Sequence, residues 1–200
     1  MSTAGGSELH PTAVTELSGD EQLTGIDATV LDFWRWAMSD LRMNNVRGYL
    51  AEFVVARAVG ATGRRVEWDA YDLVTSSGVK VEVKASGYLQ AWRQPNGVSR
   101  PTFRVPQTNG WDHAQGATVG KGWHADVYVF CLHTAQEHDN YDVLDTRQWD
   151  FYVLPRRAII RQDGRSISLT WLAQHAQGPV TVAALPAVIE ANAESSEVSQ

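Results

Sequence analysis

Three charged residues near the middle of the chain have the types and the spacing that phosphoester chemistry requires. Nine residues separate Asp72 from Glu82, and Glu82-Val83-Lys84 lies within a strictly alternating stretch. Side chains two positions apart on a strand point to one face, so Glu82 and Lys84 share a face, opposite to the neighbouring valines. If the chain folds back between Asp72 and this stretch, the aspartate comes to lie beside the glutamate. The spacing predicts two carboxylates and one ammonium group at one end of a small sheet.

Such a group of side chains suits a hard divalent cation. Two neighbouring carboxylates disfavour each other's ionisation unless a cation lies between them. Mg²⁺ (or Mn²⁺) takes one or two carboxylates together with water and substrate phosphate, and the backbone carbonyl of Val83 is a further candidate ligand. Lys84 would hold the attacking water or neutralise charge that develops on phosphorus. The metal would acidify that water, so we expect metal-dependent hydrolysis of phosphodiesters, with Asp72 and Glu82 as ligands.

The elements that must position these residues are visible in the hydrophobic pattern. Apolar residues recur at helical spacing over 29–41 and over 46–58, where Asn44 or Asn45 is a candidate cap and Gly60 a stop. The period then becomes strand-like. Extended segments are expected over 65–68, 71–74 and 79–84, with a turn at 75–78 that makes a hairpin of the last two. Further strands are expected over 102–105, 126–132 and 151–154, a short helix within 167–175, and mainly long loops over 87–123.

The order of these features resembles the PD-(D/E)XK nuclease superfamily, which has the restriction-endonuclease-like fold. The likeness rests on Asp72, on Glu82-Val83-Lys84 and on the preceding helix, which carries Glu52. It covers residues 44–92. The resemblance implies an α/β fold with an αβββαβ core, in which helices flank a mixed central sheet.

The resemblance also implies roles for individual residues. Asp72 and Glu82 would be metal ligands, Lys84 the catalytic lysine, and Glu52 a residue that helps to bind or orient the metal. Gln90, six residues after Lys84, stands where several members of the superfamily keep a supporting polar residue. Tyr71 stands where many members have proline, a position that varies within the superfamily.

The charge distribution leaves room for a polyanionic partner. The formal net charge is −6, yet all 17 lysine and arginine residues lie between Arg35 and Arg165. Eight of the 23 acidic residues lie in 1–27 and 190–200, so residues 28–189 hold 17 basic and 15 acidic residues. Because this central part is slightly basic, the overall acidity does not exclude a basic groove.

Basic and aromatic residues alternate after the candidate catalytic lysine. Such interleaving allows a protein to follow a phosphate backbone and to stack on bases. The alternative is that the tryptophans pack the core and the arginines cover it with their aliphatic stems. The candidate nucleic-acid-binding residues are Arg93, Arg100, Arg104 and Lys121.

Length and composition indicate one folded domain with polar ends. Two hundred residues suffice for a single domain with a sizeable core, which we place at 28–185. Residues 1–27 are predicted to be a mobile acidic arm, and residues 186–200 a disordered acidic tail. The first residues show neither the basic start nor the apolar run of a signal peptide, and no stretch is apolar enough to span a bilayer. With a single cysteine, Cys131, these features predict a cytoplasmic protein without a membrane partner.

The sequence therefore predicts a metal-dependent nuclease that hydrolyses DNA. A homodimer is a further expectation, because folds of this type often pair to cut both strands. Two alternatives remain: a catalytically inactive nucleic-acid-binding or assembly module of the same fold, and a nuclease that acts on RNA. A zinc site is not expected, because one cysteine and scattered histidines give no four-ligand spacing. Cys131 is then interpreted as a strand thiol, and His124 and His133 as surface residues.

Overall fold

The computed structural model describes residues 14–65, 69–112, 117–162 and 165–197. The chain forms two compact units, and the boundary between them along the sequence lies between Ser39 and Asp40. In the first unit, helix α1 (Val30–Met38) confirms the helix predicted over 29–41, and its amino end is fixed by a capping box in which Thr29 and Asp32 exchange hydrogen bonds. The mobility predicted for residues 1–27 stays a prediction. All elements described below belong to the second unit.

Helix α2 (Asn44–Ala58) confirms the second predicted helix. Asn44 is its first residue rather than a side-chain cap, because Met43 occupies the N-cap position. The helix stops where Gly60 adopts a positive φ of 65°, which glycine tolerates at no steric cost. Val55 is fully buried on the side that packs against strand β2 (Lys80–Gly87).

A five-stranded mixed sheet forms the centre of the unit, as predicted. Strand β1 (Leu73–Val74) is antiparallel to β2, and β2 is parallel to β6 (Val127–His133). The two remaining pairs of neighbours in this sheet are antiparallel. Leu73 pairs with Val81, which confirms the predicted hairpin, whereas the expected strand over 65–68 lies mostly outside the described residues. The strands, in spatial order, are β1 (Leu73–Val74), β2, β6 (Val127–His133), β7 (Trp149–Pro155) and β9 (Gln177–Val180).

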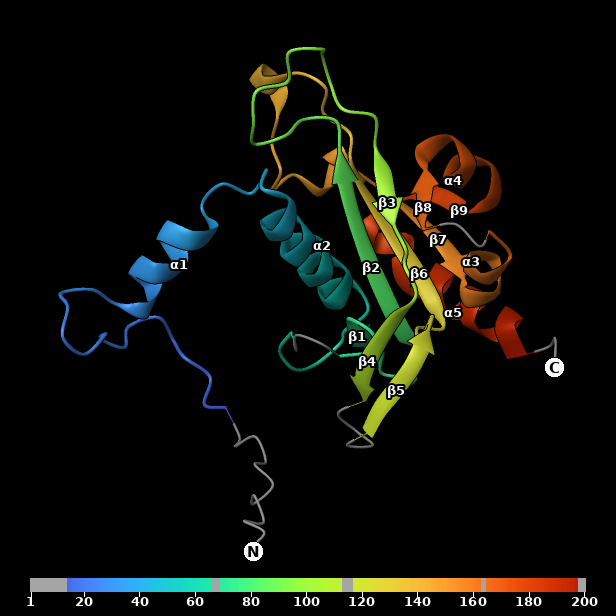
Figure 1. Cartoon of the computed structure of the whole chain (residues 1–200), viewed down its shortest axis with the longest axis horizontal. Coiled ribbons are helices and arrows are strands. Elements are labelled where there is room, and N and C mark those ends of the chain that lie inside the picture. The colour runs from blue at the N-terminus through green and yellow to red at the C-terminus, as the bar shows by residue number, and fades with distance from the viewer. Residues whose placement is uncertain (1–13, 66–68, 113–116, 163–164, 198–200) are drawn as a thin grey trace, which may run out of the picture. The chain divides into compact units, whose positions relative to one another are not determined.

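Helices cover both faces of this sheet, and the alternation along β6 shows how. All seven residues of β6 are buried. Val129 and its neighbours two positions away pack in a core with α2 and α5 (Leu185–Glu197). Phe130 points to the other face, where its ring meets the edge of Phe103 at a centroid distance of 5.3 Å. The sheet is therefore the middle layer of three, with α2 along β2 on one face (Figure 1).

The second face is covered by a small two-stranded sheet and two short helices. Strand β3 (Thr102–Arg104) pairs with β8 (Ser166–Ser168), and both lie over β6 and β7 together with α3 (Arg156–Gln162) and α4 (Leu169–His175). The strands predicted over 102–105, 126–132 and 151–154 and the helix within 167–175 are thus confirmed. Helix α3 and strands β8 and β9 were not predicted.

Two expectations for irregular structure were wrong. Part of the region expected to be long loops, 87–123, forms a hairpin of β4 (Thr108–Asp112) and β5 (Ala117–Gly122). The segment expected to be a disordered tail from residue 186 continues helix α5 to Glu197, and Ile189 is fully buried in the core. The tail's acidic composition concealed an apolar stripe that packs on β7.

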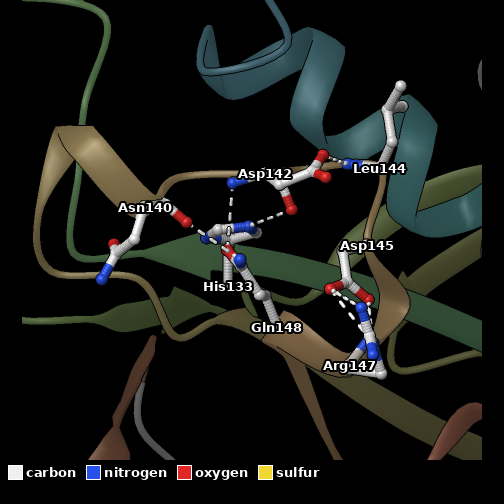
Figure 2. Close-up of polar contacts among 7 residues, drawn as sticks. All are labelled: His133, Asn140, Asp142, Leu144, Asp145, Arg147 and Gln148. Atoms are coloured by element: carbon white, nitrogen blue, oxygen red, sulfur yellow. Dashed lines mark hydrogen bonds and ion pairs between the residues drawn. The ribbon is translucent and has the colours of Figure 1, made fainter.

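Polar contacts fix the connection between β6 and β7, which contains the 3₁₀ turns η1 (His138–Asn140) and η2 (Thr146–Gln148) and is shown in Figure 2. Gln148 donates to the carbonyl of Asn140 at 2.9 Å and accepts from the N–H of Asp142 at 3.0 Å. His133 is only 2% exposed and contacts the rings of Tyr141 and Trp149. The interpretation of His133 as a surface residue was therefore wrong, because the loop folds over it.

The β4–β5 hairpin approaches the chain just before Asp72. A Cβ atom on Gly110 would lie 2.7 Å from the Cα of Ala70, whereas a Cβ on Gly120, on the partner strand, meets nothing within 4 Å. Gly110→Ala is therefore expected to lower the free energy of unfolding by about 1–3 kcal/mol through overpacking. Gly120→Ala is expected to change it by less than about 0.5 kcal/mol. Urea unfolding of both variants checks this, and equal effects would contradict the close approach.

Candidate active site

The β1–β2 hairpin places Asp72 directly against the backbone of β2. The N–H of Asp72 donates to the carbonyl of Val81 at 3.1 Å, which extends the ladder by one residue. The N–H of Val83 in turn donates to Oδ2 of Asp72 at 2.7 Å. This charge-assisted bond fixes the carboxylate beside the central strand and leaves its second oxygen for another ligand.

Glu82 and Lys84 lie on the same face of β2, as the alternation predicts. Their side chains form an ion pair, and they are only 21% and 28% exposed. Val81 and Val83 point to the opposite face and are buried in the core with α2. Burial of the valines therefore determines which way the glutamate and the lysine point.

Helix α2 contributes Glu52 from its middle turns. Arg65 donates from Nε to Oε2 of Glu52 at 2.6 Å, and the guanidinium carbon lies 4.5 Å from the centroid of the Tyr49 ring. Burial, followed by the charge of Asp72, raises the pKa of Glu52 from 4.5 to about 7. Arg65 opposes this rise without cancelling it.

The side chains predicted to form the site act on one another electrostatically. Burial and the charge of Asp72 raise the pKa of Glu82, although Lys84 opposes the rise. Burial would lower the pKa of Lys84, but Glu82 and Asp72 outweigh it, so the pKa of the ammonium group is raised. Glu52 adds to this effect. The structure thus brings Asp72, Glu82, Lys84 and Glu52 into one cluster.

Cavities open on two sides of this cluster. One of about 450 Å³ is lined by Glu52 and Asp72 together with Tyr49 and Tyr71. A narrow cavity of about 50 Å³ is lined by Glu82 and Lys84, together with residues on the face of the sheet that lies away from α2. The carboxylates are therefore accessible from solvent-filled space, as a site that acts on an external substrate requires.

Gln90 lies in a different environment. It is buried just after β2, where its amide donates to the carbonyl of Gly87 at 2.9 Å and accepts from Arg47 at 3.2 Å. Gln90 therefore supports the loop after β2, and among the described residues it forms no hydrogen bond with the carboxylates of the cluster.

The predicted nucleic-acid-binding residues separate into two pairs. Arg93 and Arg100 are exposed on the loop after β2. Arg104 and Lys121 line one further cavity, beside the second face of the sheet. The structure therefore brings only the second pair together.

The family model described as Bacteriophage T4 endonuclease IV matches residues 27–163. The chain belongs to the Bacteriophage T4 endonuclease IV family. No curated protein matches it. The matched segment contains Glu52, Asp72, Glu82 and Lys84 and ends before α4 and α5.

Three residues beside this candidate site were missed from the sequence. Arg65 pairs with Glu52, while His124 and Tyr128 line the narrow cavity beside Glu82. The charge of His124 lowers the pKa of Glu82, and burial, followed by the charge of Glu82, raises the pKa of Tyr128. The sequence could have indicated Tyr128, because the alternation along β6 directs its side chain to the face of the sheet that carries Glu82. His124 follows a hairpin that was not expected.

The donor set agrees with a hard cation. Within the described ranges, no group of three or more His, Cys, Asp or Glu side chains is spaced to hold a metal ion. Mg²⁺ needs only one or two carboxylates, because water and phosphate oxygens complete its shell. Asp72 and Glu82 supply two such carboxylates, and a cation between them would relieve the repulsion by which Asp72 raises the pKa of Glu82.

The raised pKa of Glu52 predicts a pH effect on stability. The folded chain keeps the proton of Glu52 up to about pH 7, whereas the unfolded chain releases it near pH 4.5, so ionisation favours unfolding as the pH rises through this window. Glu52→Gln cannot ionise. The free energy of unfolding of this variant, relative to that of wild type, is therefore expected to increase between about pH 5 and about pH 8. The upper limit is about 1.4 kcal/mol for each unit by which folding raises the pKa of Glu52. Urea unfolding in EDTA measures this, and a difference that does not change with pH would contradict it.

Proposed function

We propose that this endonuclease-family protein is a metal-dependent deoxyribonuclease with an active site of the PD-(D/E)XK type. The observation that carries the proposal is the convergence of Asp72, Glu82 and Lys84 on the β1–β2 hairpin, where Asp72 binds the backbone of β2 and Glu82 pairs with Lys84. Glu52 lines the same cavity as Asp72. This convergence lies inside the segment that matches an endonuclease family. The fold of a mixed sheet between helices is in keeping with the superfamily.

The geometry supports separate roles for the two central acids and for Glu52. Asp72 is held by the N–H of Val83, so one carboxylate oxygen stays directed by the backbone while the other is available to a metal. Glu82 would supply the second carboxylate and the carbonyl of Val83 a further oxygen. Glu52 has a pKa of about 7, so added positive charge favours its ionised form and its help in binding or orienting the metal.

Lys84 acts as a cation rather than a base. Its pKa is raised by Glu82 and Asp72, so the ammonium group keeps its proton at neutral pH. It would orient the attacking water and neutralise negative charge that develops on the phosphoryl group. The divalent cation, when bound, supplies the charge that polarises the phosphoryl oxygen and acidifies the water.

DNA is the proposed substrate. Arg104 and Lys121 lie together at a cavity beside the site, and Arg93 and Arg100 are exposed on the adjoining loop. These cations would bind the phosphate backbone without reading sequence. A homodimer and a cytoplasmic location stay predictions. Among the described residues, no helix has the length and apolar character needed to cross a membrane.

Cleavage assays test the proposal directly. Wild-type protein is expected to cut plasmid and linear DNA with Mg²⁺ or Mn²⁺ and to stop when EDTA is added. Lys84→Ala and Asp72→Asn are each expected to lose at least about 100-fold in rate, because each removes a charge that acts on the transition state. The control is Asp139→Asn, an exposed carboxylate in η1, which is expected to cut at the wild-type rate.

Each other outcome identifies an alternative. If wild type binds DNA without cutting it, the inactive nucleic-acid-binding module is favoured. If wild type cuts RNA alone, RNA and not DNA is the substrate. Equal rates in wild type, Lys84→Ala and Asp72→Asn would sink the assignment of the active site.

Metal binding provides a test that is independent of turnover. In calorimetric titration with Mn²⁺, Asp72→Asn and Glu82→Gln are each expected to weaken binding at least about tenfold. Lys84→Ala is expected to bind Mn²⁺ at least as tightly as wild type, because the ammonium group pairs with Glu82 and competes with the metal. Unchanged affinity in Asp72→Asn would contradict the ligand assignment.

A further inference from the structure

A basic cavity of about 440 Å³ lies next to the candidate active site. Its charged lining residues are all cationic, namely Arg104, Lys121 and Arg165. The sequence marked the first two as candidates but gave no reason to join them with Arg165. The full lining consists of Arg104, Val105, Pro106, Gln107, Lys121, Trp123 and Arg165.

Pairing between separate elements builds this cavity. Strand β3 pairs with β8 so that Arg104 lies opposite Ser166, and the N–H of Val105 donates to the carbonyl of Arg165 at 2.9 Å. The carbonyl of Val105 accepts from the indole N–H of Trp123 at 2.9 Å, just after β5, which carries Lys121. Val105 is thus fixed on both sides, and it holds the three cation-bearing segments together.

The three cations are available to a ligand. Arg104, Lys121 and Arg165 are exposed, and within the part of the chain that the structure describes none of them forms a hydrogen bond or ion pair through its side chain. Lys84 differs, because it pairs with Glu82. A cavity whose charged groups are three cations, with an amide from Gln107, favours an anion with several oxygen atoms.

The basic cavity adjoins the catalytic cluster. Val105 and Pro106 line it, and the same two residues line the narrow cavity that contains Glu82 and Lys84. An anion in the basic cavity would therefore contact residues that also line the cavity of Glu82 and Lys84. In a nucleic-acid strand, phosphates repeat along the backbone, so a strand with one phosphate at Lys84 offers others to neighbouring sites.

We propose that Arg104, Lys121 and Arg165 form a phosphate subsite that holds a non-reacting phosphate of the substrate strand close to the one that is cut. The inference rests on the proposed function. It adds a second phosphate contact, which determines which bond of the strand lies at the acids. Cations that bind a neighbouring phosphate fix the position of the strand without specifying its bases. The subsite therefore positions the scissile bond against the acids.

Binding without turnover tests this subsite. DNA binding is measured in EDTA for wild type and for the triple variant Arg104→Gln, Lys121→Gln, Arg165→Gln, between about 50 and about 200 mM salt. The triple variant is expected to bind at least about tenfold more weakly at low salt, with a slope of log K against log salt reduced by about one to two. Arg147→Gln, which removes an exposed charge paired with Asp145 in the loop of Figure 2, is expected to bind as wild type does.

A scan of the DNA locates the phosphate. One neutral methylphosphonate is placed at successive positions around the bond that is cut. At a single nearby position, the methylphosphonate is expected to weaken DNA binding by wild type. The same substitution is expected to cause no additional loss in the triple variant, because the neutral linkage and the lost cations remove the same interaction. Losses that add at every position would overturn the subsite. Thermal unfolding is expected to show unchanged stability, because all three side chains are exposed.

The outcomes separate this proposal from the one on which it rests. If wild type binds DNA and the triple variant binds it equally well with the same salt slope, the subsite is wrong and the nuclease proposal stands. If wild type does not bind DNA at all, the proposed function itself fails. If inorganic phosphate stabilises wild type but not the triple variant, while both bind DNA alike, the cavity takes a free anion and the strand subsite is overturned.

Discussion

Repulsion of Asp72 by Glu52 and by Glu82 is the constraint on which the candidate site depends. Glu52 lies on α2, and Asp72 and Glu82 lie on the β1–β2 hairpin. Among the described residues, Arg65 pairs with Glu52 and Lys84 pairs with Glu82. Burial increases the cost because it removes the water that would stabilise the negative charges. The pKa of Glu52 stays raised at about 7 despite its ion pair, so one arginine does not compensate for burial and for Asp72. A site of this kind gains stability from any additional positive charge.

The backbone holds these like charges together, which the side chains alone would not do. Asp72 is fixed by the N–H of Val83, and the direction of Glu82 is set by the burial of its valine neighbours on β2. Strand β2 is in turn fixed by its parallel pairing with β6, which is buried along its whole length. Hydrophobic burial of the sheet thus provides the free energy that keeps the acidic cluster assembled.

The sequence contained the local part of this arrangement but little of its surroundings. Strict alternation over 79–84 predicted the face shared by Glu82 and Lys84, because a strand period of two leaves one register that buries the valines. Gln90 was placed by the resemblance, from its position six residues after Lys84, and in the structure it is buried and supports the loop after β2. Arg165 could not be linked with Arg104, because β3–β8 pairing joins segments sixty residues apart and the intervening sequence carries no pattern that fixes their register.

The three cations that line the basic cavity lie on one side of the candidate site. Lys84 and Arg65 are engaged by carboxylates, whereas the three cations of the basic cavity lie beyond the wall formed by Val105 and Pro106 and have no acid in the cavity lining. Positive potential therefore rises on one side of the acids. A polyanionic strand that approaches from that side is attracted by the cavity before it meets the repulsion of the carboxylates. Under the proposed function, a cation bound between Asp72 and Glu82 would reduce that repulsion, so strand binding and metal binding should favour each other.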